Sequence, residues 1–547
     1  MSSRRILIVG GVAGGASAAT RARRMNEKAE IVIFEKGPDV SFANCGLPYH
    51  IGGQIAERDK LLVSTPQAFK DMFNIEVRCG HEVLGIDRSR HQVEVLDHVT
   101  GQRSQEKYDK LILAPGAKPI IPPWDGVTSP NVFTLRDMTD MDRIKSRVDR
   151  QSGARAVVIG AGYIGLEMVE SFTQRGWNVT LVEKEPQILP IMDPEMVRPL
   201  IDTLTGQGIV LHMGAAVDNL QVRDGQVHAV RLGDGTEIPA DLVLICIGVR
   251  PDVQLAAAAS LKIGSSGAIA VNEYLQTSDP DIYAVGDAAE VIHQVTGKPV
   301  NLPLAGPANR NGRLAGEHAA TDRCASATPV AGTAIVGLFG KAAGLTGLSA
   351  TAAQRLGIEH EVSYAIRGHH AGYYPGAEQM ILKLVYDPKT GRVLGGQAVG
   401  GAGVDKRIDV IATAIRFNGT VDDLSGVDLA YAPQFGSAKD PLHIAAFVAC
   451  NQMGGLIRQI PPGGRPIGQL IDVRGPAMHA AGALPGAINI PLPKLRESLM
   501  QLNRNEPVTV HCQVGQTSYI AARILIQSGF KEVHNLAGGY TMNKSTG

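Results

Sequence analysis

The sequence predicts an α/β protein with several domains. Residues 5–35 and 155–183 each run from a short apolar strand through a glycine-rich turn into a helix and a second strand, a unit that builds parallel sheets. The 547 residues exceed what one hydrophobic core organises. Sixty-three glycines and an aromatic content of 5% agree with many tight turns between strands and helices.

Charge and cysteine usage exclude several classes. Lysine plus arginine (53) balances aspartate plus glutamate (53), so no overall field favours nucleic acid or an anionic membrane. No apolar run approaches the roughly 20 residues of a membrane helix. The six cysteines form no CxxC pair, which argues against a disulfide scaffold and a metal site. We expect a cytoplasmic protein without metal.

The first unit contains the strand Arg5–Val9, a turn at Gly10 and Gly11, and Glu35 at the end of the next strand. A phosphate can approach such glycines, and the positive end of the following helix favours a pyrophosphate. Val12 replaces the middle glycine of G-x-G-x-x-G, which weakens the signal. The same start also resembles a secretory signal peptide, but we interpret it as a nucleotide-binding unit because the next strand completes it.

The second unit has the full G-x-G-x-x-G spacing, with Gly160, Gly162 and Gly165, and Glu183 closes the following strand. An acidic group at that strand end suits a free ribose 2′-hydroxyl and repels a 2′-phosphate, so NADH is favoured. The neighbouring Lys184 keeps NADPH open. Two such units predict two dinucleotides on one chain.

Two further segments carry a family resemblance. "TSDPDIYAVGDAAEV" and "LILAPGAKP" resemble segments of the pyridine nucleotide-disulfide oxidoreductase family. The resemblance implies two Rossmann-like dinucleotide-binding domains, the first for FAD and the second for NAD(P)H. It assigns FAD to Gly10, Ala13, Gly15, Glu35, Lys36, Ala114 and Asp287. It assigns the nicotinamide nucleotide to Gly160, Gly162, Gly165 and Glu183.

"SFANCGLPYHIGG" places a single cysteine, Cys45, after the first unit. The segment resembles the active site of the single-cysteine branch of that family, which includes coenzyme A-disulfide reductases, NADH oxidases and peroxidases. A thiolate is the nucleophile, and we expect oxidised flavin and nearby amides to lower the pKa of Cys45. It would attack a sulfur–sulfur bond and hold one half as a mixed disulfide. The alternative is a buried structural cysteine.

The segments "GYYPGAEQMILKLVYD" and "DLAYAPQFGSAKDPLH" resemble the coenzyme A-disulfide reductase branch through its α+β dimerisation domain. That resemblance implies a homodimer in which Tyr373 and Tyr431 of the partner subunit reach the active-site cysteine, with Tyr374 as a near-equal alternative to Tyr373. Packing is the other interpretation of both tyrosines. The resemblance also implies that coenzyme A contacts Arg21, Arg24, Ser41 and Asn44. For the arginines, a solvated basic helix face remains open.

The C-terminal part resembles a single rhodanese domain, through "QLIDVRGPAMHAAGALPGAINIPLPKL" and "PVTVHCQVGQTSYIAARILIQSGF". Cys512 closes the strand Val508–His511. We expect residues 513–518 to form a loop before a helix from about residue 519, with backbone amides converging on the sulfur. Thr517 stands where rhodaneses frequently have arginine, which puts a preference for anionic donors such as thiosulfate in doubt. Asp472 and Arg474 are interpreted as structural.

These observations predict the domains 1–150 (FAD, first part), 151–270 (NAD(P)H), 271–328 (FAD, second part), 329–450 (dimerisation), 451–466 (linker) and 467–547 (rhodanese). The expected activity is NAD(P)H- and FAD-dependent reduction of coenzyme A-persulfide, polysulfide or coenzyme A-disulfide at Cys45, with Cys512 delivering sulfane sulfur. Alternatives are an NADH oxidase or peroxidase that cycles through a sulfenic acid, and a redox-sensing sulfur carrier.

Overall fold

The computed structural model describes residues 3–544, so the outermost residues of the first and last expected domains lie outside it. The chain divides into two compact units: residues up to Ile188 with Thr205–Gly332, and Leu189–Leu204 with the residues from Thr333 onward. Over the described range, no helix has the length and apolar character needed to cross a membrane.

The first unit is built on a parallel sheet of order β18-β7-β1-β2-β3. Its central strand β1 (Arg5–Val9) pairs with β2 (Glu30–Glu35) and β7 (Lys110–Leu113). The outer strands are β3 (Glu76–Cys79) and β18 (Ile282–Ala284), which pairs with β7. Stretches of sequence on both sides of the second nucleotide unit therefore complete one sheet.

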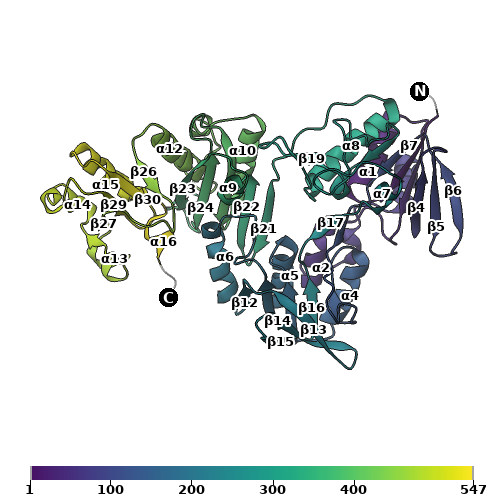
Figure 1. The fold of residues 1–547 in the computed structure, drawn as a ribbon, viewed down its shortest axis with the longest axis horizontal. Helices are drawn as coiled ribbons and strands as arrows, with labels where there is room; N and C mark the ends of the chain where they lie inside the picture. The colour runs from purple at the N-terminus through teal and green to yellow at the C-terminus, as the bar shows by residue number, and fades with distance from the viewer. Residues whose placement is uncertain (1–2, 545–547) are drawn as a thin grey trace. The chain divides into compact units, whose positions relative to one another are not determined.

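Helix α1 (Ala13–Met25) follows β1 and packs against α8 (Ala305–Thr321), as Figure 1 shows. A Cβ at Gly312 would overlap the carbonyl oxygen of Gly14, and one at Gly316 would overlap that of Ala18. Because the two backbones approach so closely, small residues are required on this face of α8. The contact fixes α1, whose amino end carries the first glycine turn.

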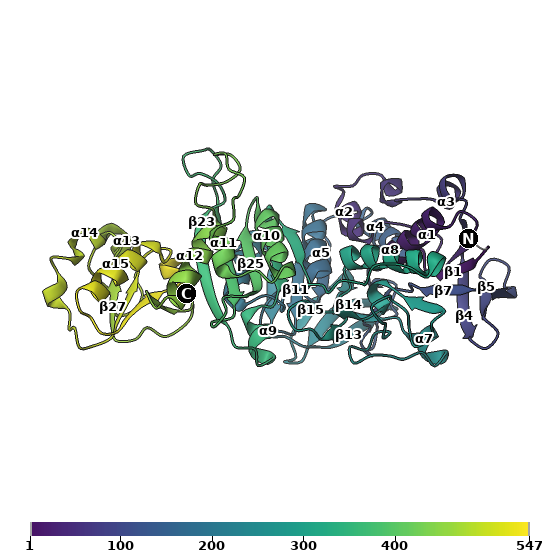
Figure 2. The same cartoon turned by 90° about the horizontal axis from the view of Figure 1, so that it is seen from above.

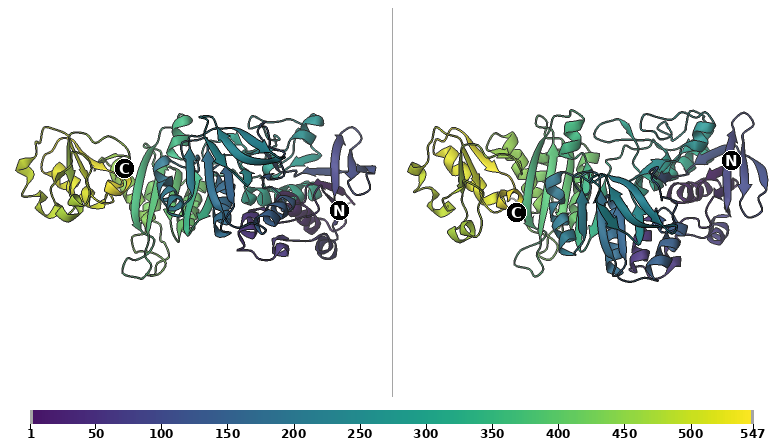
Figure 3. Two further views of the ribbon diagram at one scale, coloured as in Figure 1. Left: turned by 90° about the horizontal axis from the view of Figure 1, so that it is seen from below. Right: turned by 60° about the horizontal axis from the view of Figure 1, so that its bottom comes forward.

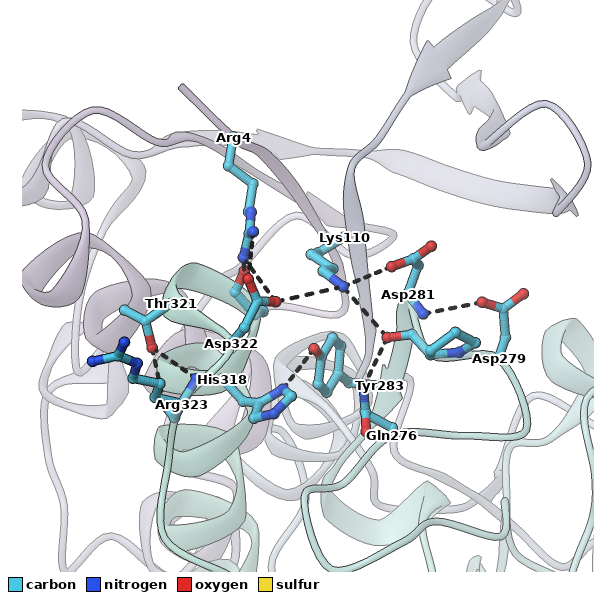
Figure 4. A network of polar contacts seen from close by, with 12 residues as sticks. Arg4, Lys110, Gln276, Asp279, Asp281, Tyr283, His318, Thr321, Asp322 and Arg323 are labelled. Carbon is cyan, nitrogen blue, oxygen red and sulfur yellow. Dashed lines mark hydrogen bonds and ion pairs between the residues drawn. The ribbon is translucent and has the colours of Figure 1, made fainter. Parts of the chain in front are cut away.

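A polar network closes the opposite edge of this sheet, at the amino ends of its strands (Figure 4). Arg4, just before β1, pairs with Asp322 at 2.7 Å, just after α8. Lys110, at the start of β7, pairs with Asp281 at 2.6 Å, just before β18. Ligands of open α/β sheets bind at the carboxyl ends of the strands, so we interpret this network as structural.

The second nucleotide unit forms a parallel sheet of order β12-β11-β10-β16-β9. Its strands are β9 (Val132–Phe133), β10 (Arg155–Ile159), β11 (Asn178–Glu183), β12 (Val210–Met213) and β16 (Leu242–Ile245). Helix α5 (Tyr163–Gln174) follows β10, and an antiparallel sheet of β13 (Val217–Arg223), β14 (Gln226–Leu232) and β15 (Glu237–Pro239) packs with its core.

The remaining helices and strands complete the first unit. They are η1 (Asn44–Gly46), α2 (Leu47–Gly52), η2 (Arg58–Leu61), α3 (Pro66–Phe73), β4 (His81–Asp87), β5 (Gln92–Asp97), β6 (Arg103–Lys107), β8 (Ala117–Pro119), α4 (Met138–Val148), β17 (Val249–Pro251), α7 (Gln254–Ala258), η3 (Gly286–Ala288), β19 (Val291–Ile292) and β20 (Pro299–Val300).

The second unit begins with an antiparallel sheet of order β21-β22-β25-β24-β23. The strands are β21 (Ala334–Leu338), β22 (Lys341–Gly347), β23 (Glu361–Gly368), β24 (Gln379–Tyr386) and β25 (Val393–Gly400). Helix α10 (Val404–Arg416) packs on β25 and β22, and α12 (Pro441–Met453) packs on β23 and β24 (Figure 2). Two short helices, α9 (Ala350–Arg355) and α11 (Val421–Ser425), complete this part.

The segment Leu189–Leu204 groups with this sheet, although the sequence suggested that it belongs to the NAD(P)H domain. It contains most of α6 (Pro194–Gly206). Asp193 and Glu195 lie 2.7 and 2.5 Å from the buried ammonium of Lys383 on β24. Burial alone would raise the pKa of Asp193, but the charge and hydrogen bond of Lys383 outweigh it and lower the pKa to about 2.

The C-terminal sheet has the order β26-β30-β29-β27-β28 and is parallel (yellow in Figure 3). Its elements are β26 (Arg458–Ile460), β27 (Gln469–Asp472), α13 (Pro476–Ala480), β28 (Ile488–Asn489), α14 (Leu492–Leu495), η4 (Leu499–Gln501), β29 (Val508–His511), α15 (Gln516–Gln527), β30 (Val533–Leu536) and α16 (Gly539–Asn543). The expected linker 451–466 thus holds the last turn of α12 and an edge strand, β26.

Substituting Lys383 with methionine should strongly destabilise the antiparallel sheet of the second unit. The change leaves the carboxylates of Asp193 and Glu195 without their buried cation, which costs about 3–5 kcal/mol. Hydrogen–deuterium exchange of the β24 amides in the full chain measures the loss as faster exchange. Lys389→Met is the matched control because the Lys389–Glu359 pair is exposed. Equal exchange in the two variants would contradict the assignment.

Candidate functional site

Two glycine turns have the same backbone construction. Gly10 and Gly160 adopt positive φ angles of 91° and 106°. A Cβ at Gly10 would overlap the carbonyl oxygen of Ala114, and one at Gly160 would overlap that of Cys246. Glycine is therefore required twice over at each turn, by conformation and by close approach.

The third glycine of each motif serves helix packing. A Cβ at Gly15 would overlap the carbonyl oxygen of Gly10, and Gly165 has the same relation to Gly160. The middle position differs, because a Cβ at Gly162 would meet no atom within 4 Å and the residue has an ordinary negative φ of −79°. Val12 occupies the equivalent place with φ −94°. The backbone tolerates valine there, so the missing glycine does not disrupt the first turn.

A glutamate braces each turn from the neighbouring strand. Glu35 accepts a hydrogen bond from the amide of Gly11 at 2.8 Å, and Glu183 accepts one from Ala161 at 2.7 Å. The second oxygen of Glu35 accepts from Gly37. Burial raises the pKa of Glu35, although these two amides oppose the shift. The glutamates thus organise the turns and keep lone pairs for a further hydroxyl donor.

The other positions matched to FAD lie in the same unit. Ala13 is the first residue of α1, and the amide of Ala114, just after β7, donates to Val9 at 2.8 Å. Lys36 is exposed and pairs with Glu82 at 2.8 Å. Asp287 lies in η3, where burial raises its pKa and Arg136 opposes the shift. The open backbone at the turns and the amino ends of α1 and α5 fit dinucleotide phosphates.

Cys45 lies in η1, directly before α2, and is exposed. Helix α2 packs against α5, the helix that follows the second glycine turn. The Ser171 hydroxyl donates to the carbonyl of Pro48 at 2.8 Å, and the Tyr49 hydroxyl donates to Glu167 at 3.0 Å. The cysteine segment is therefore held by the second nucleotide unit as well as by its own.

Neighbouring groups of the chain act against the thiolate of Cys45. The protein atoms around the thiol raise its pKa, and the negative charges of Glu167 and Asp287 raise it further. Burial also raises the pKa of Glu167, and the hydrogen bond from Tyr49 partly opposes this shift. The expected lowering of the Cys45 pKa included the oxidised flavin and stays a prediction. Spacing in the sequence gave no signal for Tyr49 or Glu167.

The positions matched to coenzyme A separate into two kinds. Asn44 and Arg24 are exposed. Ser41 is buried and has a positive φ of 51°. Its backbone N–H donates a hydrogen bond to the carbonyl oxygen of Gly11 at 2.9 Å. Arg21 is already paired with Glu317 at 2.5 Å. The nearby Arg23 is buried and donates to backbone carbonyls, so the basic residues of α1 are not one solvated face.

The structure brings Tyr373 and Tyr431 together within the second unit. Their hydroxyl oxygens lie 3.2 Å apart, and the two side chains are 78% and 50% exposed. Tyr374 instead places its ring edge-on against His370, at 5.6 Å between centroids. This pairing favours Tyr373 over Tyr374 as the partner of Tyr431.

Cys512 is buried at the end of β29. Its sulfur accepts hydrogen bonds from the Gly515 amide at 3.2 Å and the Ser518 hydroxyl at 3.4 Å. Helix α15 begins at Gln516, about three residues earlier than expected, because Gly515 turns the chain with φ 93°. The cradle around the sulfur thus contains one backbone amide, where the sequence led us to expect several, and a hydroxyl that the sequence did not single out.

A buried charge cluster supports the loop that holds Cys512. Asp472 pairs with Arg474 at 2.7 Å and with His479 at 2.8 Å, and Arg474 also donates to the side chain of Gln513 at 3.2 Å. Burial would raise the pKa of Asp472, but the hydrogen bonds from Arg474 lower it to about 2. These contacts support the structural interpretation of Asp472 and Arg474.

Comparison with protein families matches residues 4–306 to Pyridine nucleotide-disulphide oxidoreductase, residues 333–441 to the dimerisation domain of the same group and residues 461–544 to a Rhodanese-like domain. The first match covers more than half of the chain. This chain belongs to the pyridine nucleotide-disulphide oxidoreductase family.

Similar proteins of this family include the coenzyme A disulfide reductase of Staphylococcus epidermidis, 34% identical over 81% of this chain and 99% of the relative. The structure of reduced Bacillus anthracis CoADR-RHD is similar, with a TM-score of 0.94, 42% identity and coverage of 99% and 98% of the two chains. The structure of a NAD-dependent persulfide reductase from A. fulgidus is also similar. Its TM-score is 0.93 and its sequence identity 36%, with coverage of 98% of this chain and 99% of that chain.

Membership of the pyridine nucleotide-disulphide oxidoreductase family implies FAD and NAD(P)H. The first glycine turn with Glu35 would hold FAD, and the second with Glu183 would hold the nicotinamide nucleotide. FAD supplies two-electron transfer when it is bound. The chain's own residues provide the cradles and place Cys45 on a segment held by α5.

Substituting Glu167 with glutamine should lower the pKa of Cys45. The change removes a negative charge that raises this pKa, so the thiolate fraction at neutral pH increases. The pH dependence of alkylation of Cys45 by iodoacetamide measures the shift. Glu170→Gln, three residues along the same helix, is the control. A titration midpoint unchanged in Glu167→Gln would show that this charge does not act on the thiol.

Substituting Ser518 with alanine should slow transfer of sulfur from a Cys512 persulfide to cyanide by about tenfold. The hydroxyl donates to the sulfur that becomes a thiolate when the sulfane sulfur leaves, and hydrogen bonds to charged groups contribute about 1.5 kcal/mol or more. Stopped-flow release of thiocyanate measures the rate. Thr517→Ala removes an adjacent, exposed hydroxyl and should react at the original rate; equal slowing in both would count against the assignment.

Proposed function

We propose that this oxidoreductase uses NAD(P)H and FAD to reduce coenzyme A-persulfide, polysulfide or coenzyme A-disulfide at Cys45. The observation that carries the proposal is one exposed cysteine held between two dinucleotide cradles, in a chain that has a second sulfur-handling site at Cys512. The names of similar proteins, a coenzyme A disulfide reductase and a persulfide reductase, support the same substrate class.

The chemistry needs only one protein thiol because the substrate supplies the second sulfur. The Cys45 thiolate attacks the coenzyme A-bound sulfur of the persulfide, the sulfur–sulfur bond breaks and hydrosulfide leaves. A mixed disulfide between Cys45 and coenzyme A remains. Two electrons and a proton, derived from NAD(P)H, then cleave it to coenzyme A thiol and the Cys45 thiolate. Each cycle thus reduces one sulfur–sulfur bond.

We further propose a homodimer in which Tyr373 and Tyr431 act on Cys45 of the other subunit. A phenol can donate a proton to a departing sulfur anion. The 3.2 Å contact between the two hydroxyls would let one tyrosine orient the other. The match to a dimerisation domain supports this arrangement.

In the proposal, one set of residues contacts coenzyme A and a different residue selects between NADH and NADPH. Arg21, Arg24, Ser41 and Asn44 are the proposed coenzyme A contacts, and Arg21 would exchange its bond to Glu317 for a phosphate. Glu183 would accept from the ribose 2′-hydroxyl and so favour NADH. A cytoplasmic location completes the proposal.

Cys512 would carry sulfane sulfur and deliver it to coenzyme A or directly to the reductase site. The cradle supplies an amide and a hydroxyl to the sulfur, and the two exposed side chains at the start of α15, Gln516 and Thr517, are uncharged. A donor that presents its charge directly at the sulfur, such as thiosulfate, would find no arginine at position 517.

Steady-state NADH oxidation tests the proposal with coenzyme A-persulfide, coenzyme A-disulfide and polysulfide as substrates. Cys45→Ser should lose every sulfur-dependent activity by roughly 10³-fold or more. Cys512→Ser should lose activity with polysulfide while it retains activity with coenzyme A-persulfide. Cys324→Ser, which removes a cysteine outside both sites, is the control.

Other outcomes would select a different function. Full activity of Cys45→Ser with all sulfur substrates would refute the proposal. Rapid turnover of hydrogen peroxide, with none of coenzyme A-persulfide, would select peroxidase chemistry through a sulfenic acid. A wild-type protein that consumes no NADH with polysulfide, but passes sulfur from Cys512 to an acceptor, would be a sulfur carrier.

A further inference from the structure

A cavity of about 800 Å³ in the first unit lies on one face of helix α4 and the residues that follow it. Its lining includes Arg143, Arg147 and Arg150, which follow one another at helical spacing, and Arg58 from η2 on another segment. None of the lining residues belongs to either glycine turn or to the Cys45 segment. The volume lies in the range of small-molecule sites.

The other faces of α4 explain why this one is cationic. Met141, Ile144 and Val148 are buried in the core, so the helix must turn its polar residues away from them. The acidic Asp149 is paired with Lys145 and Arg175, away from the cavity. Asp149 therefore forms its ion pairs with residues outside the lining of the cavity.

Charge around the cavity is unbalanced. Four arginines line it, against a single carboxylate, Asp142. That carboxylate pairs with Arg58, which also pairs with Asp39. In the part of the chain that the structure describes, no ion pair engages the other three arginines of the lining. An anion entering the cavity would meet three guanidinium groups that no ion pair occupies, although Asp140 lies near enough to Arg143, and Asp241 to Arg147, for their charges to interact.

Two of these arginines make contacts with uncharged groups of the chain. The Arg143 guanidinium lies over the ring of Phe133, 5.6 Å from its centroid. Arg147 donates to the backbone carbonyl of Asp241 at 2.9 Å. Its Nε atom is buried without a hydrogen-bond partner among the described residues. A buried donor without an acceptor costs free energy, which a bound anion would recover.

We propose that this cavity binds an oligophosphate anion, either free or as part of a nucleotide. Guanidinium groups match phosphate geometry through paired N–H donors. The exposed Arg143 guanidinium, held over the buried ring of Phe133, supplies a flat cationic surface on which a base can stack. A merely solvated arginine face would not place Arg58 from a separate segment in the same lining or leave Arg147 Nε buried.

Isothermal titration of the FAD-loaded full chain tests the site, with NAD⁺ and coenzyme A present at saturation to fill the proposed nucleotide sites. The probes are tripolyphosphate, ATP and adenosine. Tripolyphosphate and ATP should bind and adenosine should not. Tighter binding of ATP than of tripolyphosphate would assign the site to a nucleotide, and the reverse order would assign it to a free oligophosphate.

Variants separate this site from general attraction to positive charge. Arg143→Gln with Arg147→Gln should weaken binding of both phosphate probes by roughly tenfold for each arginine removed. Arg90→Gln with Arg103→Gln removes the same charge from exposed positions elsewhere in the unit and should leave binding unchanged. Ser146→Glu, at an exposed position of the same face, should abolish binding because it adds a negative charge while all four arginines stay in place.

Three results would overturn the proposal. They are equal affinity in the cavity and control variants, adenosine binding as tightly as ATP, and no heat of binding with either phosphate probe at millimolar concentration. The absence of any heat of binding would also be seen if a second copy of the chain covered the cavity in solution. Sedimentation of Ser146→Glu as a smaller species than the original protein would identify such a covered cavity.

Discussion

Close passage of backbone over backbone is the constraint on which both nucleotide cradles depend. At Gly10 and Gly160 the turn passes over the carbonyl that follows a neighbouring parallel strand, with no room for a side chain. Only this approach lets the amino ends of α1 and α5 point along the carboxyl edge of each sheet. The glutamates that bond to the turn amides hold the same geometry from the other side. The cradles are thus built mainly of backbone and fixed by two carboxylates.

The position of the Cys45 segment depends on this arrangement. Because α5 starts at the second turn, and Pro48 and Tyr49 bond to residues of α5, the second cradle and the Cys45 segment are mechanically linked. The same helix contributes Glu167, whose charge opposes the thiolate. The protein environment that positions the thiol therefore also raises its pKa, first by burial and then through the charges of Glu167 and Asp287.

Much of this organisation follows from sequence because it depends on local rules. Glycine spacing and strand-end acids predicted both turns, and apolar runs predicted Arg5–Val9 and Val508–His511 with their observed bounds. Matches to known families confirmed the family, the dimerisation domain and the C-terminal domain. The predictions that failed depended on contacts between residues far apart in the sequence. Arg458–Ile460 lies in a Gly/Pro-rich stretch that was predicted to be a linker, but it pairs as an edge strand with β30. The same distinction applies to single residues, since Glu167 and Tyr49 lie on different domains and only the α2–α5 packing joins them. The segment around Asp193 continues the nicotinamide unit in sequence, yet its partner Lys383 lies far along the chain on β24.

The two proposed sulfur sites differ in how the chain surrounds the thiol. Cys512 is buried and receives hydrogen bonds from the loop that surrounds it, so its cradle is complete within one domain. Cys45 is exposed, lies beside carboxylates and has no comparable set of donors in the described part of its own unit. A site that lacks its own stabilising donors must obtain them from what binds beside it. In our proposal, that dependence limits reduction at Cys45 to molecules that bring a sulfur partner, while Cys512 can hold sulfur alone.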